Sequence, residues 1–148
     1  MAVEDYLEAV DYGRTWAKGA YASDPRLVAD TYIARGPCYA GFLDGKLLGV
    51  AGICLLWPGV GEAWAVPTEW GRRHGKHYHR AVRDGYRQIV TEQRLRRVHA
   101  WVDAEFWVGI RWAMALGFRV ETPRLRGYGP QGQDFVLLSQ FPSQKEPV

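Results

Sequence analysis

The amino-acid sequence predicts an α/β fold, and three local patterns carry this prediction. Residues 38–53 have the pattern of a β-hairpin, residues 75–93 that of a long amphipathic helix, and residues 97–121 that of a strand–helix–strand unit. Strands and helices that alternate along a chain pack as a sheet covered by helices. We therefore expect one domain over residues 1–141, followed by a disordered polar tail at 142–148.

The N-terminal region is predicted to be helical. Apolar residues recur there with a rough helical period as far as about residue 22. Ser23-Asp24-Pro25 then has the side-chain oxygen and the early proline of a second helix start. This second helix should end before Gly36-Pro37, and no strand is evident ahead of the hairpin.

The hairpin prediction rests on Asp44-Gly45, a pair that readily adopts the tight turn between antiparallel strands. Strand-like apolar runs flank this turn at 38–43 and 46–53. Trp57-Pro58-Gly59 should break the second run, and a third short strand is expected at 61–66.

The long helix at 75–93 should have two chemically distinct faces. One is an apolar stripe toward the core, formed by Tyr78, Ala81, Val82, Gly85, Tyr86, Ile89 and Val90. The other is basic and extends into the preceding loop, with Arg72, Arg73, Lys76, Arg80, Arg83 and Arg87.

The strand–helix–strand unit is predicted to end its helix at a glycine. Ile110 and Met114 lie one helical turn apart on an apolar face, and Gly117 is suited to the left-handed conformation at a helix C-terminus. Two final strands are expected at 118–126 and 135–141, joined by a turn-rich segment.

Composition restricts the classes of function. The 148 residues are 47% hydrophobic and 24% charged, with a formal net charge of +3, which is typical of a soluble globular domain. No secretion signal or membrane-spanning run is evident, so we expect a cytoplasmic protein. Cys38 and Cys54 match neither a metal site nor a disulfide framework, so we expect free thiols and no metal.

Tryptophan is frequent, with seven residues in the chain. Four fall in predicted strands or on an apolar helix face and are expected in the core: Trp57, Trp64, Trp101 and Trp112. Trp70 and Trp107, at predicted junctions between loops and helices, are the ones that could line a cleft.

Three short segments, together with the order of the elements, carry a resemblance to a known family. The segments are Val102-Asp103-Ala104, Ile110-Arg111-Trp112 and Leu116-Gly117-Phe118. On these features residues 38–141 resemble the GNAT (Gcn5-related N-acetyltransferase) superfamily, most of all its small phage and prophage proteins. The resemblance implies a mixed central β-sheet flanked by helices and splayed open between the third and fourth predicted strands, with acetyl-CoA lying in the opening.

The resemblance also implies a cofactor site. In the superfamily, a loop with the pattern Arg/Gln-x-x-Gly-x-Gly/Ala presents helix N-terminal amides to the coenzyme A pyrophosphate, where unpaired N–H groups favour an anion. Arg72 and Gly75 match the first half of this pattern, whereas His77 replaces the last Gly or Ala. The residues expected to bind the cofactor are Ala65, Val66, Arg72, Arg73, His74, Gly75 and Lys76.

Acetyl transfer requires a base for the amine and a proton donor for the leaving thiolate. Glu62 stands where several members of the superfamily keep the base, although a glutamate on a strand can also simply face solvent. The tyrosine that often acts as the acid is replaced by Ala113, and an asparagine common at that helix start by Phe106. Tyr128, or alternatively His99, could supply the proton.

The function implied by the resemblance is direct transfer of an acetyl group from acetyl-CoA to an amine of an unidentified small molecule or protein. A nucleic-acid partner for the basic helix face is an alternative, but no aromatic residues interleave with it. A second alternative is a non-catalytic phage protein that binds a host factor or belongs to the virion. Such a scaffold could fill its cleft with Trp64, Trp70 or Trp107. A homodimer is also open.

Overall fold

The computed structural model describes residues 1–16 and 24–142, with backbone alone for residues 11–16. The predicted tail at 143–148, and the part of the N-terminal helix expected beyond residue 16, lie outside the described residues. No helix in the described part of the chain is long and apolar enough to cross a membrane.

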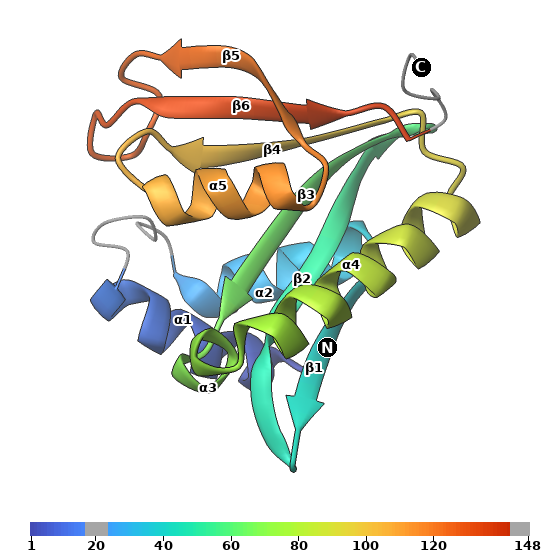
Figure 1. The fold of residues 1–148 in the computed structure, drawn as a ribbon, viewed down its shortest axis with the longest axis vertical. Helices are drawn as coiled ribbons and strands as arrows, with labels where there is room; N and C mark the ends of the chain where they lie inside the picture. The colour runs from blue at the N-terminus through green and yellow to red at the C-terminus, as the bar shows by residue number, and fades with distance from the viewer. Residues whose placement is uncertain (17–23, 143–148) are drawn as a thin grey trace.

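Helices and strands follow one another in the predicted order (Figure 1). The elements are α1 (Val3–Trp16), α2 (Pro25–Arg35), β1 (Cys38–Leu43), β2 (Lys46–Trp57), β3 (Val60–Pro67), α3 (Glu69–Arg73), α4 (Gly75–Glu92), β4 (Arg97–Asp103), α5 (Trp107–Ala115), β5 (Arg119–Leu125) and β6 (Phe135–Gln140). The second strand of the hairpin runs four residues further than predicted. Asp44 and Gly45 both have positive φ, of 52° and 75°, as the predicted tight turn requires.

The six strands form one mixed sheet in the order β1-β2-β3-β4-β6-β5. Its only parallel neighbours among the described strands are β3 and β4, which pair over three positions, from Val60 with Arg97 to Glu62 with His99. Beyond Glu62 the two strands diverge, as Figure 1 shows. The predicted splayed α/β sheet is confirmed.

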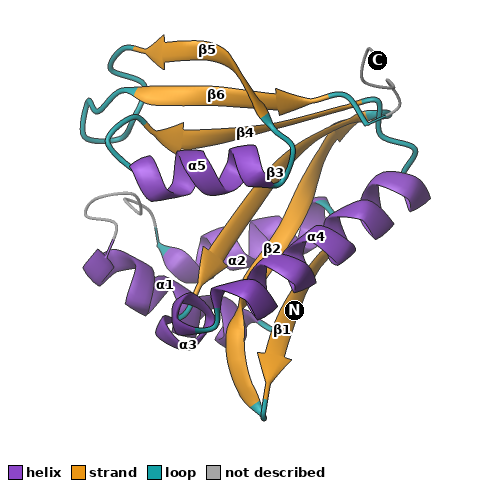
Figure 2. Ribbon diagram, viewed as in Figure 1, coloured by secondary structure: helices purple, strands orange, loops and turns teal. Residues whose placement is uncertain are grey.

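Helices cover both faces of the sheet (Figure 2). On one face α4 and α5 pack through Ile89 and Ala113 against Val98 and Leu138. On the other face α1 and α2 pack against β2 and β3 through Tyr6, Val10, Ala29, Val50 and Val66. Successive side chains of a strand point to opposite faces, so each wall of the opening between β3 and β4 contributes side chains to both helical layers.

A short helix, α3, occupies the segment that we predicted to be a loop. Thr68 caps it, because the Thr68 Oγ1 accepts a hydrogen bond from the Gly71 N–H at 3.1 Å and donates to the Leu47 carbonyl at 2.6 Å. Gly71 lets α3 approach β2 closely, since a Cβ at this position would lie 1.8 Å from the Leu48 carbonyl oxygen. The cap and the glycine therefore dock α3 against the start of β2.

The C-terminus of α5 offers a test of the backbone. Gly117 has φ of 102°, as its sequence context predicts. We expect Gly117→Val to lower the free energy of unfolding by about 1–3 kcal/mol, because a β-branched residue is strained in this conformation. Urea unfolding measures the change.

The matched control is Gly75→Val, at the first position of α4. Gly75 has no positive φ, and a Cβ there would meet no atom within 4 Å. This control should change stability by less than about 1 kcal/mol. Equal stability of Gly117→Val and wild type would contradict the proposed strain.

Candidate active site

The divergence of β3 and β4 leaves a cavity of about 580 Å³. It lies between the two strands and reaches both helical layers, since its wall includes Tyr32 of α2, Tyr86 of α4 and Ala113 of α5. This volume is within the range of small-molecule binding sites. The cavity therefore occupies the place where the resemblance implies a ligand.

The edge of β3 along this cavity has no neighbouring strand beyond Glu62. On its other edge β3 pairs with β2, where the Thr68 N–H donates to the Leu48 carbonyl at 3.0 Å. Hydrogen bonding alternates along an antiparallel ladder. The register therefore directs the backbone N–H and C=O of Ala65 toward the cavity and those of Val66 toward β2. A ligand in the cavity can thus pair with the backbone of β3.

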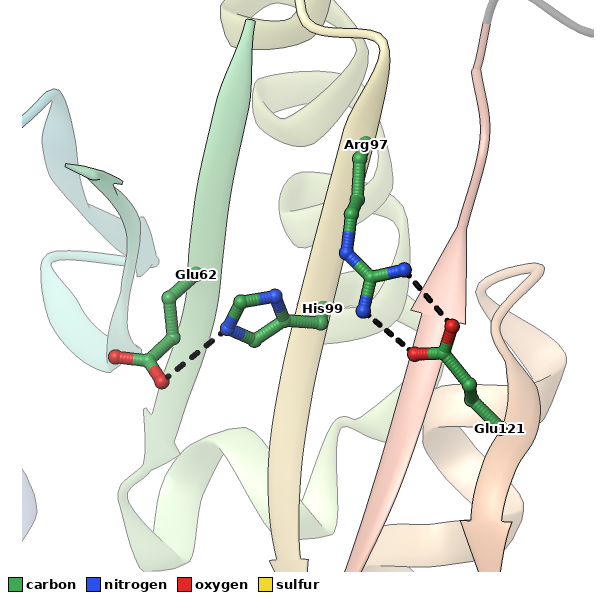
Figure 3. Close-up of polar contacts among 4 residues, drawn as sticks. All are labelled: Glu62, Arg97, His99 and Glu121. Atoms are coloured by element: carbon green, nitrogen blue, oxygen red, sulfur yellow. Dashed lines mark hydrogen bonds and ion pairs between the residues drawn. The ribbon is translucent and has the colours of Figure 1, made fainter. Parts of the chain in front are cut away.

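Glu62 lies at the point where the strands separate, and its side chain is part of the cavity wall. Its Oε1 is 3.6 Å from the Nε2 of His99 on the adjacent strand (Figure 3). The side chains of Glu62 and His99 are 34% and 12% exposed, so the carboxylate is accessible while the imidazole is largely enclosed. A carboxylate in this position can accept a proton from a ligand in the cavity.

A second ion pair lies beside this contact. Arg97 forms two hydrogen bonds with Glu121, one of them 2.9 Å long (Figure 3). Hydrogen bonding to Arg97 lowers the pKa of the Glu121 carboxyl group below its ordinary value. Arg97 and Glu121 thus form a pair of their own beside the contact of Glu62 with His99.

Tyr86 is a polar group of the cavity wall that the sequence patterns assigned to an apolar stripe. Its hydroxyl oxygen is buried and has no hydrogen-bond partner among the described residues. Burial raises the pKa of Tyr86, so its hydroxyl stays protonated and can donate a hydrogen bond. Ala113, where the resemblance implies a tyrosine, is part of the same wall.

Tyr128 is not part of the cavity wall. It is 53% exposed in the segment between β5 and β6, and its ring stacks on Trp101 with centroids 4.8 Å apart. Its suggested role as a proton donor stays a prediction. His99, the alternative donor, lies beside Glu62.

The residues expected to bind the cofactor fall into two groups. Ala65 and Val66 are part of the cavity wall, whereas Arg72, Arg73, His74, Gly75 and Lys76 lie at the junction of α3 and α4. No side chain caps α4 at His74, and the surroundings of Gly75 are open. The first amides of a helix lack partners within the helix. The junction therefore suits an anion, as the coenzyme A pyrophosphate would require.

Of two contacts near this junction, one stays within α3 and the other reaches the cavity wall. Arg73 forms an exposed ion pair with Glu69, with a nitrogen–oxygen distance of 3.2 Å. The His79 Nδ1 accepts a hydrogen bond from the Trp112 Nε1 at 3.0 Å, and Trp112 is part of the cavity wall. The first turns of α4 are thus joined to the cavity through α5.

The tryptophan assignments from the sequence need correction. Trp64, Trp101 and Trp112 line the cavity, and Trp57 is 60% exposed rather than in the core. Trp70 and Trp107 are not part of the wall, since the Trp70 indole N–H donates to the Leu43 carbonyl and Trp107 is 70% exposed. Trp64 and Trp101 line the cavity because strand positions beside the splay border an opening, whereas Trp112 reaches it from α5.

No group of three or more His, Cys, Asp or Glu side chains in the described residues is placed to hold a metal ion. Both cysteines, Cys38 and Cys54, are free thiols outside the cavity wall. Burial raises the pKa of Cys38, and it raises the pKa of Cys54 to about 11. These thiols are therefore poorly suited to act as nucleophiles.

Neither a family model nor a curated protein sequence matches the chain. Solved structures do resemble it. One is yncA from Salmonella typhimurium, described as an acetyltransferase and solved with its cofactor acetyl-CoA, with 14% identity, a TM-score of 0.71, and coverage of 100% of this chain and 94% of that chain.

Two further solved structures share the architecture. A ribosomal-protein-alanine N-acetyltransferase from Brucella melitensis has 15% identity, a TM-score of 0.68, and coverage of 95% of this chain and 96% of that one. A variant of the spermidine N-acetyltransferase SpeG from Vibrio cholerae has 12% identity, a TM-score of 0.73, and coverage of 97% and 93%. At such identities the likeness is one of fold, and the chain has the fold of the GNAT acetyltransferases.

Proposed function

We propose that this protein is an acetyl-CoA-dependent N-acetyltransferase. The observation that carries the proposal is the cavity between β3 and β4, which combines an open strand edge with the Glu62 carboxylate in one wall. The fold of solved acetyltransferases supports it. The cytoplasmic location, the phage-like origin and the homodimer suggested above stay predictions.

Acetyl-CoA would supply, from its thioester, the acetyl group that forms the amide bond with the acceptor amine, and coenzyme A would leave as its thiol. The α3–α4 junction would hold its pyrophosphate, with Arg72, Arg73 and Lys76 providing positive charge near the amides of α4. The strand edge at Ala65 would hold the part of the molecule that enters the cavity. These residues fit the ligand because the junction is basic and uncapped while the cavity is open.

The chain's own groups can then perform the proton transfers. Glu62 removes a proton from the acceptor ammonium, which makes the amine a nucleophile. The Ala65 amide points toward the cavity and can stabilise negative charge that develops there. Tyr86, in the same wall, has a buried hydroxyl that is left without a partner among the described residues. His99 lies next to Glu62, with its Nε2 3.6 Å from the carboxylate.

Isothermal titration with acetyl-CoA tests the proposal. We expect saturable binding at micromolar to sub-millimolar concentration, and release of free coenzyme A when an amine panel is added. Absence of binding at millimolar acetyl-CoA would overturn the proposal. Binding without turnover for any amine would instead favour the non-catalytic alternative, in which the fold keeps the cofactor but not the chemistry.

Direct transfer also predicts that the thiols are dispensable. We expect Cys54 in the native protein to resist iodoacetamide at pH 7.5, because its raised pKa leaves almost no thiolate at that pH. Mass spectrometry should show alkylation only after unfolding. Rapid modification of native Cys54 together with loss of activity would contradict direct transfer and point to a covalent acetyl-cysteine.

A further inference from the structure

The charge of the cavity is opposite to that of the chain. The protein has a formal net charge of +3, yet the charged side chains in the cavity wall are Glu62, Asp103 and Glu105, with no Lys, Arg or His of the described residues among them. The basic residues of the α3–α4 junction lie outside this wall. A cleft lined by one sign of charge attracts ligands of the other sign.

On the sheet face covered by α1 and α2, aromatic rings line the cavity both on its β3 side and on its β4 side. On the β3 side, the Trp64 and Tyr32 rings stack with centroids 4.2 Å apart, and Tyr6 meets Trp64 edge to face at 5.8 Å. These three residues are part of the wall. Their faces and edges offer apolar contact and attraction for a cation.

The β4 side of the cavity has a second aromatic group. Trp101 and Phe135 are both part of the wall, and the exposed Tyr128 ring packs against each of them, at centroid distances of 4.8 Å and 5.4 Å. The ring of Trp101 also meets the His99 ring edge to face at 5.7 Å. Tyr128 therefore supports this wall from outside, whatever its part in proton transfer.

The carboxylates of the wall are spread along the opening rather than clustered. Glu62 is at the closed end of the opening on β3, and Asp103 is the last residue of β4. The Asp103 Oδ1 accepts a hydrogen bond from the Glu105 backbone N–H at 2.9 Å, which holds the side chain at the end of the strand. Carboxylates flanked by aromatic rings bind an ammonium group through charge and through the rings together.

We infer that the acceptor is a small amine that is a cation in solution and carries a flat apolar body, such as an arylalkylamine. This inference rests on the proposed function and specifies its substrate class. The ammonium would lie at Glu62, the carboxylate at the closed end of the opening, and the flat body would lie between the two aromatic sides. A cavity of about 580 Å³ has room for such a molecule beside an acyl donor.

The test compares 2-phenylethylamine with its neutral isostere 2-phenylethanol, by titration without acetyl-CoA. We expect the amine to bind at least about tenfold more tightly. Glu62→Gln keeps the shape of the side chain but removes the charge, so it should abolish most of this preference without weakening the alcohol. The control Asp44→Asn, at the exposed hairpin tip, should leave both affinities unchanged.

Spermidine and a lysine-containing peptide complete the panel. Tighter binding of either than of 2-phenylethylamine would overturn the inference that the acceptor has a flat apolar body. Equal binding of amine and alcohol would overturn the inference that the acceptor binds as a cation. In both cases the acetyltransferase proposal survives if acetyl-CoA binds and any amine is acetylated. If acetyl-CoA fails to bind, the proposed function fails, while the comparison of amine with alcohol still reports on the cavity.

Discussion

Replacing Glu62 by glutamine is expected to lower turnover about a hundredfold near pH 7. The amide keeps the shape of the side chain but cannot take a proton from the acceptor ammonium. Activity should recover as rising pH deprotonates the amine in solution, so the pH profile of the variant should climb toward that of the wild type. Affinity for acetyl-CoA should stay unchanged, as titration can show.

The matched control is Glu121→Gln, which makes the same change in a carboxylate already bound to Arg97. Turnover of this control should equal that of the wild type, because Glu121 is outside the cavity wall. If Glu62→Gln were fully active across the pH range, Glu62 would have no part in deprotonation. Water or His99 would then take the proton.

Replacing Arg72 and Arg73 together with alanine should weaken acetyl-CoA binding about tenfold to a hundredfold, a total of about 1.4–2.8 kcal/mol, because two positive charges near the pyrophosphate are lost. Both residues lie in the last turn of α3, next to the uncapped start of α4. Thermal stability should change little, because exposed ion pairs such as Arg73 with Glu69 contribute little to folding. Titration calorimetry measures the affinity.

A double replacement of Arg83 and Arg87 with alanine removes the same charge from later turns of α4 and serves as the control. Its effect on acetyl-CoA affinity should be small and should vanish with added salt, since distant exposed charges are screened. Equal losses in the two double variants would mean that binding depends on the basic face as a whole. The pyrophosphate site would then not be the α3–α4 junction.

Local patterns were sufficient to predict most of the elements. Asp44-Gly45 specifies a tight turn because both residues tolerate positive φ, and Gly117 ends α5 for the same reason. The stripe of α4 buries Tyr78, Val82 and Ile89 as its period predicts. The helix α3 was not predicted, although Thr68 followed by Glu69 is a helix-start pattern. A helix of five residues is too short to show a helical period in the sequence.

The candidate site could be predicted in part from the sequence and in part only from the tertiary structure. Glu62 and Ala65 could be assigned from the sequence, because position on a strand and a family resemblance both follow from residue order. The contact of Glu62 with His99, which are 37 residues apart, depends on how far β3 and β4 remain paired. That length is decided by packing of the helices on both faces and has no local signature.

The sequence by itself determined the elements, the turns and the basic start of α4, since these depend on neighbouring residues. Only the tertiary structure decided which side chains line the cavity. Trp64 and Trp101 were predicted to be core residues from their strand positions, and Tyr86 was predicted to belong to an apolar helix stripe, yet all three are part of the cavity wall. Each faces the cavity because β3 and β4 stop pairing after three positions, so residues that would be buried in a continuous sheet border an opening instead.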